Sequence, residues 1–509
     1  MTHPLSRSWV RGALLACALP LGNLLAQVHY HEDGHPWKQR ANKGPDAEVP
    51  GWYYNLGATG LRIELVAAEP KAMVVRHVFA ATPAAGKVAV GDVITGAGGR
   101  PFAEAHQNGY GMKVFGARGP VGEFAAALDA CAVPAAGGRL ALTVRRGTEV
   151  QEVVLELGST HDAFGPDFPA DCAKSKRVRE NLLAWLRANQ RKDGSFGNPV
   201  HDTFAPLALL ATGRADDLDR VERCARRLAE RTAGRDESEG LRNWNYMTAA
   251  IVLSEYFLAT KAAWVPAELQ EVHDFLAWSQ YLDMAQLNPK AKQSHPHSFP
   301  KGPMDSHGGW GHNPGFEGYG PIAMLTGQGA LAYALMHRCG IRIDRERHDA
   351  AYAFLVRGTG PNGYVWYGDG VGDPKGWADM GRTGAAGIAN LLSPWPEPVY
   401  RERALAHARV IGAHPESFPD THGSPVLGMG YAALAAHADP GNFRKLMDAN
   451  RWWFTLAECP DGTCYYQPNR DNAGYGADAR MSASAVVAFI LSIPQRTLVV
   501  TGKDETKAR

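Results

Sequence analysis

The feature of the chain that most constrains its fold is the alternation of two kinds of helical segment over its C-terminal two thirds. One kind is amphipathic and charged, and the other is apolar and rich in small residues. The amphipathic segments begin near residues 174, 216, 265, 344, 398 and 440. The apolar segments cover about 203–212, 246–260, 319–338, 382–392, 425–437 and 482–492. Such paired segments at repeating intervals predict stacked helical hairpins, with one long insertion before the third apolar segment.

Six hairpins with charged helices outside and apolar helices inside predict an all-α (α/α)6 toroid over residues 172–494, followed by a C-terminal tail over 495–509. Ala and Gly, as in the run Thr-Gly-Ala-Ala-Gly-Ile-Ala at 383–389, suit the inner ring because small side chains let helix axes approach. An open superhelical solenoid is the alternative way to stack the same hairpins.

Several loops before the apolar segments combine Gly with aromatic residues. They lie at 194–197, 308–311, 363–368 and 462–466. The run Asn-Gln-Arg-Lys-Asp-Gly-Ser-Phe-Gly at 189–197 resembles the Gln-Trp type repeat of terpenoid cyclases and the related loops of protein prenyltransferases. The resemblance implies an α/α toroid. It implies neither cyclase nor thioester chemistry, because the chain has no Asp-x-Asp-Asp, Asp-Asp-x-x-Asp or Cys-Gly-Glu-Gln motif.

Residues 51–158 have the pattern of short strands and turns, which predicts a small β-rich domain. Three runs carry a resemblance: Val-Phe-Ala-Ala-Thr-Pro-Ala-Ala-Gly at 78–86, Val-Gly-Asp-Val-Ile at 90–94 and Gly-Gly-Arg-Pro at 98–101. They are similar to the central signature of PDZ domains in exported bacterial proteins.

The PDZ resemblance implies that the loop at 56–63 binds the carboxylate of a peptide C-terminus, through Gly60, Leu61, Arg62 and Ile63. The alternative is that the domain only docks on its neighbour. A PDZ-like domain followed by a toroid also resembles a family of exported bacterial proteins of uncharacterised function, which implies no particular reaction.

The N-terminus predicts export. Residues 1–26 contain Arg7 and Arg11, an apolar run and no acidic residue, which is typical of a cleaved signal peptide. A lipoprotein anchored at Cys17 is the alternative. Residues 27–50 are expected to be a linker. The mature protein is therefore expected in the periplasm or secreted, where Cys459 and Cys464 are expected to form a disulfide across a Pro-Asp-Gly turn.

The charge of the chain disfavours two classes of partner. It has 53 basic and 52 acidic residues, a net charge of +1. No basic excess is present to attract nucleic acid or anionic lipid, and the apolar run at the N-terminus is too short for a permanent membrane span. No phosphate-binding Gly-rich loop or serine-hydrolase motif is present either, and the cofactor is left open.

The long insertion holds the densest group of candidate catalytic residues. Asp305, His307, His312 and Glu317 are predicted acid/base groups, provided that the loop folds over a cavity. The alternatives are loop-capping roles and a zinc site, although the spacing fits no standard zinc motif. The expected aromatic wall of the cavity consists of Trp310, Tyr319, Tyr364, Trp366 and Tyr466. Further candidates at the cavity edge are Asp202, Asp369, Asp379, Arg382, Asp420, His422 and Arg470.

Three functions are compatible with these patterns, and whether the chain is an enzyme is left open. The main hypothesis is a binding or scaffold protein, with the PDZ-like module taking a peptide or partner protein, or docking on the toroid. The alternative is a toroid hydrolase or lyase that acts on a carbohydrate. The third is a toroid that binds an apolar, isoprenoid-like ligand without cyclase chemistry.

Overall fold

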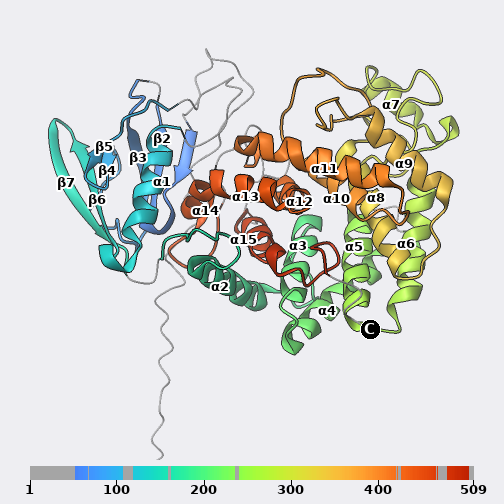
Figure 1. Ribbon diagram of the computed structural model, residues 1–509, viewed down its shortest axis with the longest axis horizontal. Helices are drawn as coiled ribbons and strands as arrows, with labels where there is room; N and C mark the ends of the chain where they lie inside the picture. The colour runs from blue at the N-terminus through green and yellow to red at the C-terminus, as the bar shows by residue number, and fades with distance from the viewer. Residues whose placement is uncertain are drawn as a thin grey trace, which may run out of the picture.

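The computed structural model describes residues 52–66, 68–106, 118–158, 162–235, 240–419, 421, 426–465, 467 and 479–503 (Figure 1). They form a small antiparallel sheet with a helix on it, followed by a large helical region. The predicted signal peptide and linker lie outside the described residues. Within the described residues, no helix has the length and apolar character needed to cross a bilayer.

The sheet is built from short antiparallel strands. In the described residues its order is β1-β2-β3-β4-β6-β7, with β5 beside β4. The strands are β1 (Trp52–Asn55), β2 (Leu61–Leu65), β3 (Met73–Val78), β4 (Val93–Ala97), β5 (Arg100–Pro101), β6 (Arg139–Arg146) and β7 (Glu149–Glu156). Helix α1 (Pro120–Cys131) packs on β4 and β6.

The core of this domain follows from the alternation of its strands. In β6 the side chains of Leu140, Leu142 and Val144 are buried, and the residues between them are more exposed. Phe124 and Leu128 of α1 belong to the same hydrophobic cluster. The predicted β-rich domain is therefore present.

The helical region closes into a ring. Its inner helices are α3 (Pro199–Leu210), α5 (Arg242–Thr260), α8 (Ala323–Arg338), α10 (Gly381–Leu391), α12 (Leu427–Ala436) and α15 (Ala479–Ile490). Each packs on the next, and α15 packs on α3. The toroid is thus confirmed against an open solenoid, since the last inner helix meets the first.

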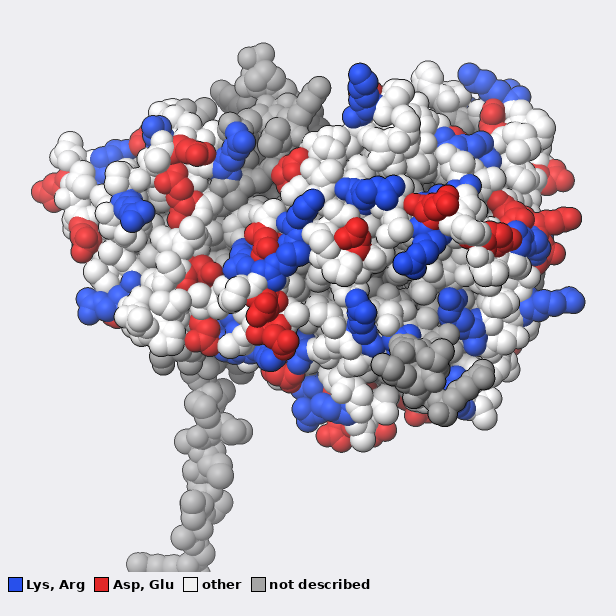
Figure 2. All heavy atoms as spheres, in the orientation of Figure 1, with Lys and Arg blue, Asp and Glu red and all other residues white. Residues whose placement is uncertain are grey.

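The outer helices lie where the charged segments were predicted. They are α2 (Ala173–Asn189), α4 (Ala215–Thr232), α6 (Val265–Ser279), α9 (Arg345–Arg357), α11 (Pro398–Ala413) and α13 (Pro440–Ala449). Two short helices complete the described set, α7 (Pro289–Ser294) and α14 (Arg451–Ala457). Acidic and basic side chains are interspersed over the face in Figure 2.

Small residues set the spacing of the inner helices, as expected. A Cβ on Gly384 of α10 would lie 2.4 Å from the backbone nitrogen of Ala432 in α12, and one on Gly327 of α8 would lie 2.7 Å from Cβ of Ala385 in α10. Any larger side chain at these positions would push neighbouring helices apart.

The Gly-aromatic loops have a structural role that repeats around the ring. Gly194, Gly308, Gly363 and Gly462 all have positive φ values, between 80° and 93°. Each lies against the outer helix of the next hairpin. The first three would place a Cβ within 2.9 Å of a backbone oxygen of α4, α9 and α11, and Gly462 lies against Asn181 of α2. The last loop therefore touches the first helix and closes the ring.

The sheet domain docks on the toroid through α14 (Figure 1). Leu456 of α14 belongs to the core cluster of the sheet domain, and helix α1 packs on α14. The 3-10 turn Gly57–Thr59 also packs on α14. An ion pair of 3.0 Å joins Lys174 of α2, which is buried, to Asp129 of α1. The structure therefore agrees with the alternative in which the β-rich domain docks on its neighbour.

The predicted peptide-binding loop is buried, partly in the core of its own domain and partly against the toroid, which contradicts peptide binding there. Gly60, Leu61, Arg62 and Ile63 are all buried. Strand β2 has β1 on one side and β3 on the other, which leaves no edge for a peptide strand. The Arg62 guanidinium donates to Oδ1 of Asn55 and lies over the rings of Phe79 and Tyr465.

The predicted disulfide is not formed. Cys459 and Cys464 are both buried free thiols. The backbone of the turn is held by other bonds, because Cys459 N donates to Thr463 O and Cys464 N donates to the hydroxyl of Ser484. The Sγ of Cys459 is directed to the carbonyl of Ala457, at 3.7 Å.

Candidate functional site

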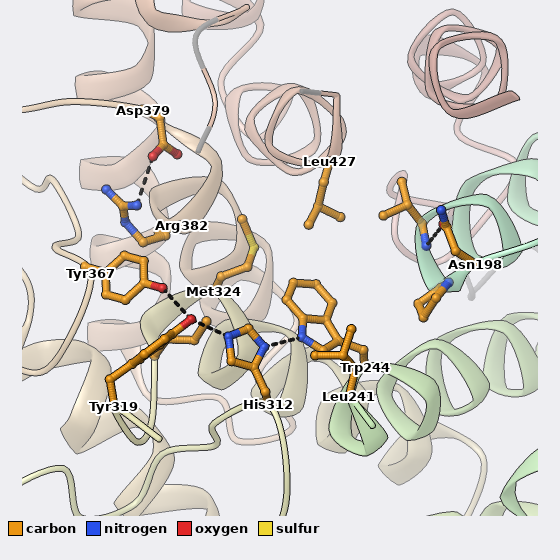
Figure 3. Close-up of a pocket in the computed structure, with 13 residues that line it drawn as sticks. Asn198, Leu241, Trp244, His312, Tyr319, Met324, Tyr367, Asp379, Arg382 and Leu427 are labelled. Atoms are coloured by element: carbon orange, nitrogen blue, oxygen red, sulfur yellow. Dashed lines mark hydrogen bonds and ion pairs between the residues drawn. The ribbon is translucent and has the colours of Figure 1, made fainter. Parts of the chain in front are cut away.

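A cavity of about 400 Å³ opens at the end of the ring where the inner helices begin. It is lined by Asn198, Pro199, Val200, Leu241, Trp244, His312, Tyr319, Ile322, Met324, Tyr367, Asp379, Arg382 and Leu427 (Figure 3). These residues come from the first turns of five inner helices and the loops before them. Part of the insertion folds over this end of the ring. The sequence analysis required this arrangement for residues of the insertion to act in a cavity.

A chain of hydrogen bonds crosses one wall of the cavity. Trp244 Nε1 donates to Nδ1 of His312 at 2.8 Å. Nε2 of His312 is hydrogen-bonded to the hydroxyl of Tyr319, and the hydroxyl of Tyr367 donates to the same oxygen at 3.1 Å. Figure 3 shows these side chains in one line from Trp244 to Tyr367.

The chain of bonds determines the tautomer of His312. An indole N–H is only a donor, so Nδ1 of His312 must accept and carries no proton. The proton of the neutral ring is therefore on Nε2, which donates to Tyr319. Burial lowers the pKa of His312, and the charge of Glu317 opposes this more weakly, so the neutral form prevails at neutral pH.

The oxygen of Tyr319 thus receives two hydrogen bonds from protein donors. Its two lone pairs are used by His312 and Tyr367, so the hydroxyl hydrogen is left to point elsewhere. Tyr319 is half-buried and lines the cavity.

Next to Tyr367, the cavity wall holds an ion pair. Arg382 Nη1 donates to Oδ2 of Asp379 at 2.9 Å, and Oδ1 of Asp379 accepts from the backbone of Gly381. Arg382 Nη2 donates to the hydroxyl of Tyr364 at 2.6 Å. Its guanidinium lies 5.5 Å from the centre of the Tyr367 ring. The arginine is thereby held in one orientation beside the phenols.

Of the four predicted acid/base residues, the structure places only His312 in the cavity. Asp305 and Glu317 are exposed and do not line it. Asp305 instead accepts from the backbone of Lys301 and Gly302, which is a loop-capping role. His307 lies outside the lining as well, and burial together with Arg357 lowers its pKa.

Of the predicted aromatic wall, Tyr319 is in the lining. Trp310 is fully buried in the core, where its Nε1 donates to the carbonyl of Leu276. Tyr364 is buried behind Arg382, and Trp366 lies outside the lining with its ring against Gly372. Tyr466 lies outside the described residues, as do Asp420, His422 and Arg470.

Among the other candidates, Asp379 and Arg382 line the cavity, and two carboxylates support loops instead. Asp202 accepts from the backbone of Phe196 and Gly197, and burial raises its pKa. Asp369 accepts from the backbone of Ser306 and from the Arg357 side chain.

The sequence analysis did not identify Trp244, whose one signal was an aromatic residue in the first turn of an inner helix. No three His, Cys, Asp or Glu side chains of the described residues are grouped as metal ligands.

Comparisons with known proteins concern the toroid. A family model described as "Domain of unknown function (DUF6288)" matches residues 175–502. No curated protein is significantly similar to the chain.

Several solved structures match part of the chain at low similarity. The GH76A α-1,6-mannanase of Salegentibacter sp. HEL1_6 is 13% identical, with 63% of this chain and 98% of that chain covered and a TM-score of 0.43. A polysaccharide lyase is 10% identical, with 64% and 98% covered and a TM-score of 0.43. The type II terpene cyclase MstE of Scytonema is 11% identical, with 64% and 97% covered and a TM-score of 0.39. Similarities this distant carry no information about substrate or reaction.

Proposed function

Because the chain belongs to the DUF6288 family, whose description assigns no activity, we propose a function from the cavity itself. We propose that the toroid is an enzyme that acts on a carbohydrate by proton transfer at Tyr319, as a lyase rather than a hydrolase. The observation that carries this proposal is the convergence of two donors, from His312 and Tyr367, on the Tyr319 oxygen inside the cavity.

The two donors suit an oxygen that alternately holds and releases a proton. Hydrogen bonds from His312 and Tyr367 stabilise negative charge on the phenol oxygen. His312 does not take the proton of Tyr319, because its Nε2 already carries one. We therefore assign proton transfer to Tyr319 and its orientation to His312.

The walls of the cavity fit a sugar ring. Trp244, Tyr319 and Tyr367 each combine an apolar ring with a polar atom, and sugars present apolar C–H faces between their hydroxyl groups. The volume of about 400 Å³ lies within the range of small-molecule sites, roughly 300 to 1,000 Å³. One sugar unit beside the phenols would fill a substantial part of it.

The carboxylates of the cavity favour elimination over hydrolysis. Glycosidases generally use two carboxylates on opposite sides of the bond that breaks. Among the described residues that line this cavity, Asp379 is the single carboxylate, and both its oxygens are already bonded to Arg382 and the Gly381 backbone. It is therefore poorly placed to act as nucleophile or acid.

Elimination needs no second carboxylate and consumes no water. In a 4-linked uronic acid, a base takes the proton from C5, the C4–O bond breaks, a C4=C5 double bond forms, and the leaving oxygen receives a proton. Tyr319, as phenolate, takes the C5 proton and returns it to the leaving oxygen. We assign Arg382, with Asp379 as its ion-pair partner, to the side of the uronate carboxylate, because it is the single Lys or Arg in the described lining.

The test is a panel of polysaccharides incubated with the full chain, with pectate, alginate and chondroitin as uronic-acid substrates and a mannan as neutral control. A lyase produces reducing ends together with the ultraviolet absorbance of the conjugated double bond. Reducing ends without the absorbance would show hydrolysis and overturn the lyase assignment. No product from any member of the panel would overturn the carbohydrate assignment for these substrates.

The sheet domain is assigned a structural role in this proposal. We take it as a PDZ-like fold whose ligand loop serves as a docking surface for α14, in place of peptide capture. This interface supports the hairpin that closes the ring. Export by the N-terminal segment, to the periplasm or outside, remains part of the proposal and agrees with a polysaccharide substrate.

A further inference from the structure

The cavity is divided into a polar half and an apolar half. In Figure 3, Tyr319, Tyr367, Asp379 and Arg382 lie on one side, and Leu241, Trp244, Leu427 and Asn198 lie on the other. The polar half consists of His312, Tyr319, Tyr367, Asp379 and Arg382. The apolar half consists of Pro199, Val200, Leu241, Ile322, Met324 and Leu427, with the Trp244 ring and Asn198 beside them. The side-chain oxygen of Asn198 is already used as a helix cap, because it accepts from the backbone of Val200 and His201. A site for a bare sugar chain would be expected to carry hydroxyl-binding groups on both sides.

Leu241 is the most informative residue of the apolar half. The residue is 51% exposed, although it lines the cavity. Its backbone has φ 59°, in the left-handed region that a branched apolar residue rarely adopts. An exposed leucine held in an unfavourable conformation contributes nothing to the core, and such strain is often found where a residue contacts a ligand.

Three residues of the apolar half offer no partners for polar groups. Leu241, Met324 and Leu427 present only carbon or thioether sulfur to the space between them, and a hydroxyl placed there would lose its hydrogen bonds to water. An apolar group placed there would gain free energy from burial.

We infer that the substrate is an amphipathic glycoside, a sugar that carries an alkyl, aryl or prenyl group. The sugar lies against Tyr319 and Arg382, and the apolar group lies between Leu241, Met324 and Leu427. This inference rests on the proposed function for the sugar half, and it adds the chemical class of the substituent. It also explains why one cavity has polar groups suited to a sugar and apolar side chains suited to a hydrocarbon group.

The test is calorimetric titration of the full chain with methyl, hexyl and octyl β-D-glucuronide and with 1-octanol, all below their micelle concentrations. We expect the dissociation constant to fall at least tenfold from the methyl to the octyl glucuronide, because the chain is buried. We expect octanol to bind at least tenfold more weakly than octyl glucuronide, because it lacks the sugar.

Leu241→Asn tests the apolar half without endangering the fold. Asn adopts a left-handed backbone more easily than Leu, so the variant should fold at least as well. We expect it to reduce the dependence on alkyl length severalfold and to leave the methyl glucuronide affinity unchanged. The matched control is Val399→Asn on α11, at a residue that is 39% exposed and does not line the cavity. It should leave both affinities unchanged.

Two outcomes overturn the inference in distinguishable ways. Equal affinities for methyl and octyl glucuronide would contradict the inference of an apolar subsite and would leave the lyase proposal intact. Equal affinities for octanol and octyl glucuronide would show that the sugar is not recognised, and the proposed function would fail with it.

Discussion

The indole nitrogen of Trp244 donates a hydrogen bond to Nδ1 of His312 over 2.8 Å, although the two residues are 68 positions apart in the chain. Trp244 lies in the first turn of an inner helix, and His312 lies in the long insertion. Their contact therefore joins the insertion to the ring. It also leaves the single proton of the neutral imidazole on the nitrogen that faces Tyr319.

Trp244→Phe should impair catalysis through the position of that proton. Phe retains most of the ring but removes the donor, so His312 is free to carry its proton on either nitrogen. We expect kcat to fall between roughly 10- and 100-fold, with a smaller change in KM. Steady-state kinetics on an identified substrate measures both.

The pH profile separates this positioning role from a loss of packing. Burial lowers the pKa of His312 from its usual 6.5, so the part of the acid limb of wild-type kcat that arises from protonation of His312 should lie below pH 6.5. Without the Trp244 donor facing Nδ1, protonation becomes easier, and the acid limb should move to higher pH. A variant with lower kcat and an unmoved acid limb would contradict the assignment.

Gly57→Ala should weaken the interface between the sheet domain and the toroid. Gly57 has φ 58°, and an added Cβ would lie 2.5 Å from the carbonyl oxygen of Thr455 in α14. We expect unfolding to require roughly 1 to 3 kcal/mol less free energy, the cost typical of backbone strain. Gly86→Ala is the matched control, because it has φ 76° and open space around the added methyl. Equal losses of stability in the two variants, measured by denaturant unfolding, would show that the Thr455 contact has no part.

Glu255 should make the protein less stable as pH rises. Its carboxylate is buried and accepts from the backbone of Val499 and Val500, and burial raises its pKa to about 7 from 4.5. Between these values the folded state binds more protons than the unfolded state, so stability is fully present below pH 4.5 and is lost as pH rises through 7. The loss between pH 5 and pH 8 should be on the order of 2 kcal/mol.

Glu255→Gln tests this linkage, because glutamine does not titrate. We expect the contribution of this residue to the pH slope of the unfolding free energy to vanish, whatever the change in absolute stability. Chemical denaturation of both proteins at pH 5 and pH 8 gives the comparison. A slope that is the same in the two proteins would show that Glu255 is not the group responsible.

The local parts of the fold were predictable because they depend on neighbouring residues. The segment expected from 398 begins at Pro398, and the one expected near 344 begins after Asp344, which caps α9 through the backbone of Arg347. Pro and Asp at helix starts are signals that the sequence displays directly. The small residues of the inner segments likewise predicted their close packing.

The site was predictable only in part because it depends on contacts between distant residues. His312 and Tyr319 were found by their type and density in one loop. Trp244 and Tyr367 come from the two neighbouring hairpins, and only the stacking of these hairpins brings them to the insertion. The docking of the sheet domain also depends on distant residues. The backbone N–H of Asn55 donates to Oε1 of Gln467, which is 412 positions away in the chain.

The most direct test of the central claim compares Tyr319→Phe with Tyr367→Phe and the wild type, on any polysaccharide or glycoside that the wild type cleaves. Phe at 319 keeps the ring and removes the reacting oxygen, so we expect kcat to fall roughly 10²- to 10⁴-fold with substrate affinity retained. Tyr367→Phe removes one of two donors to that oxygen and should cost less. A Tyr319→Phe enzyme that retains wild-type kcat would contradict the account.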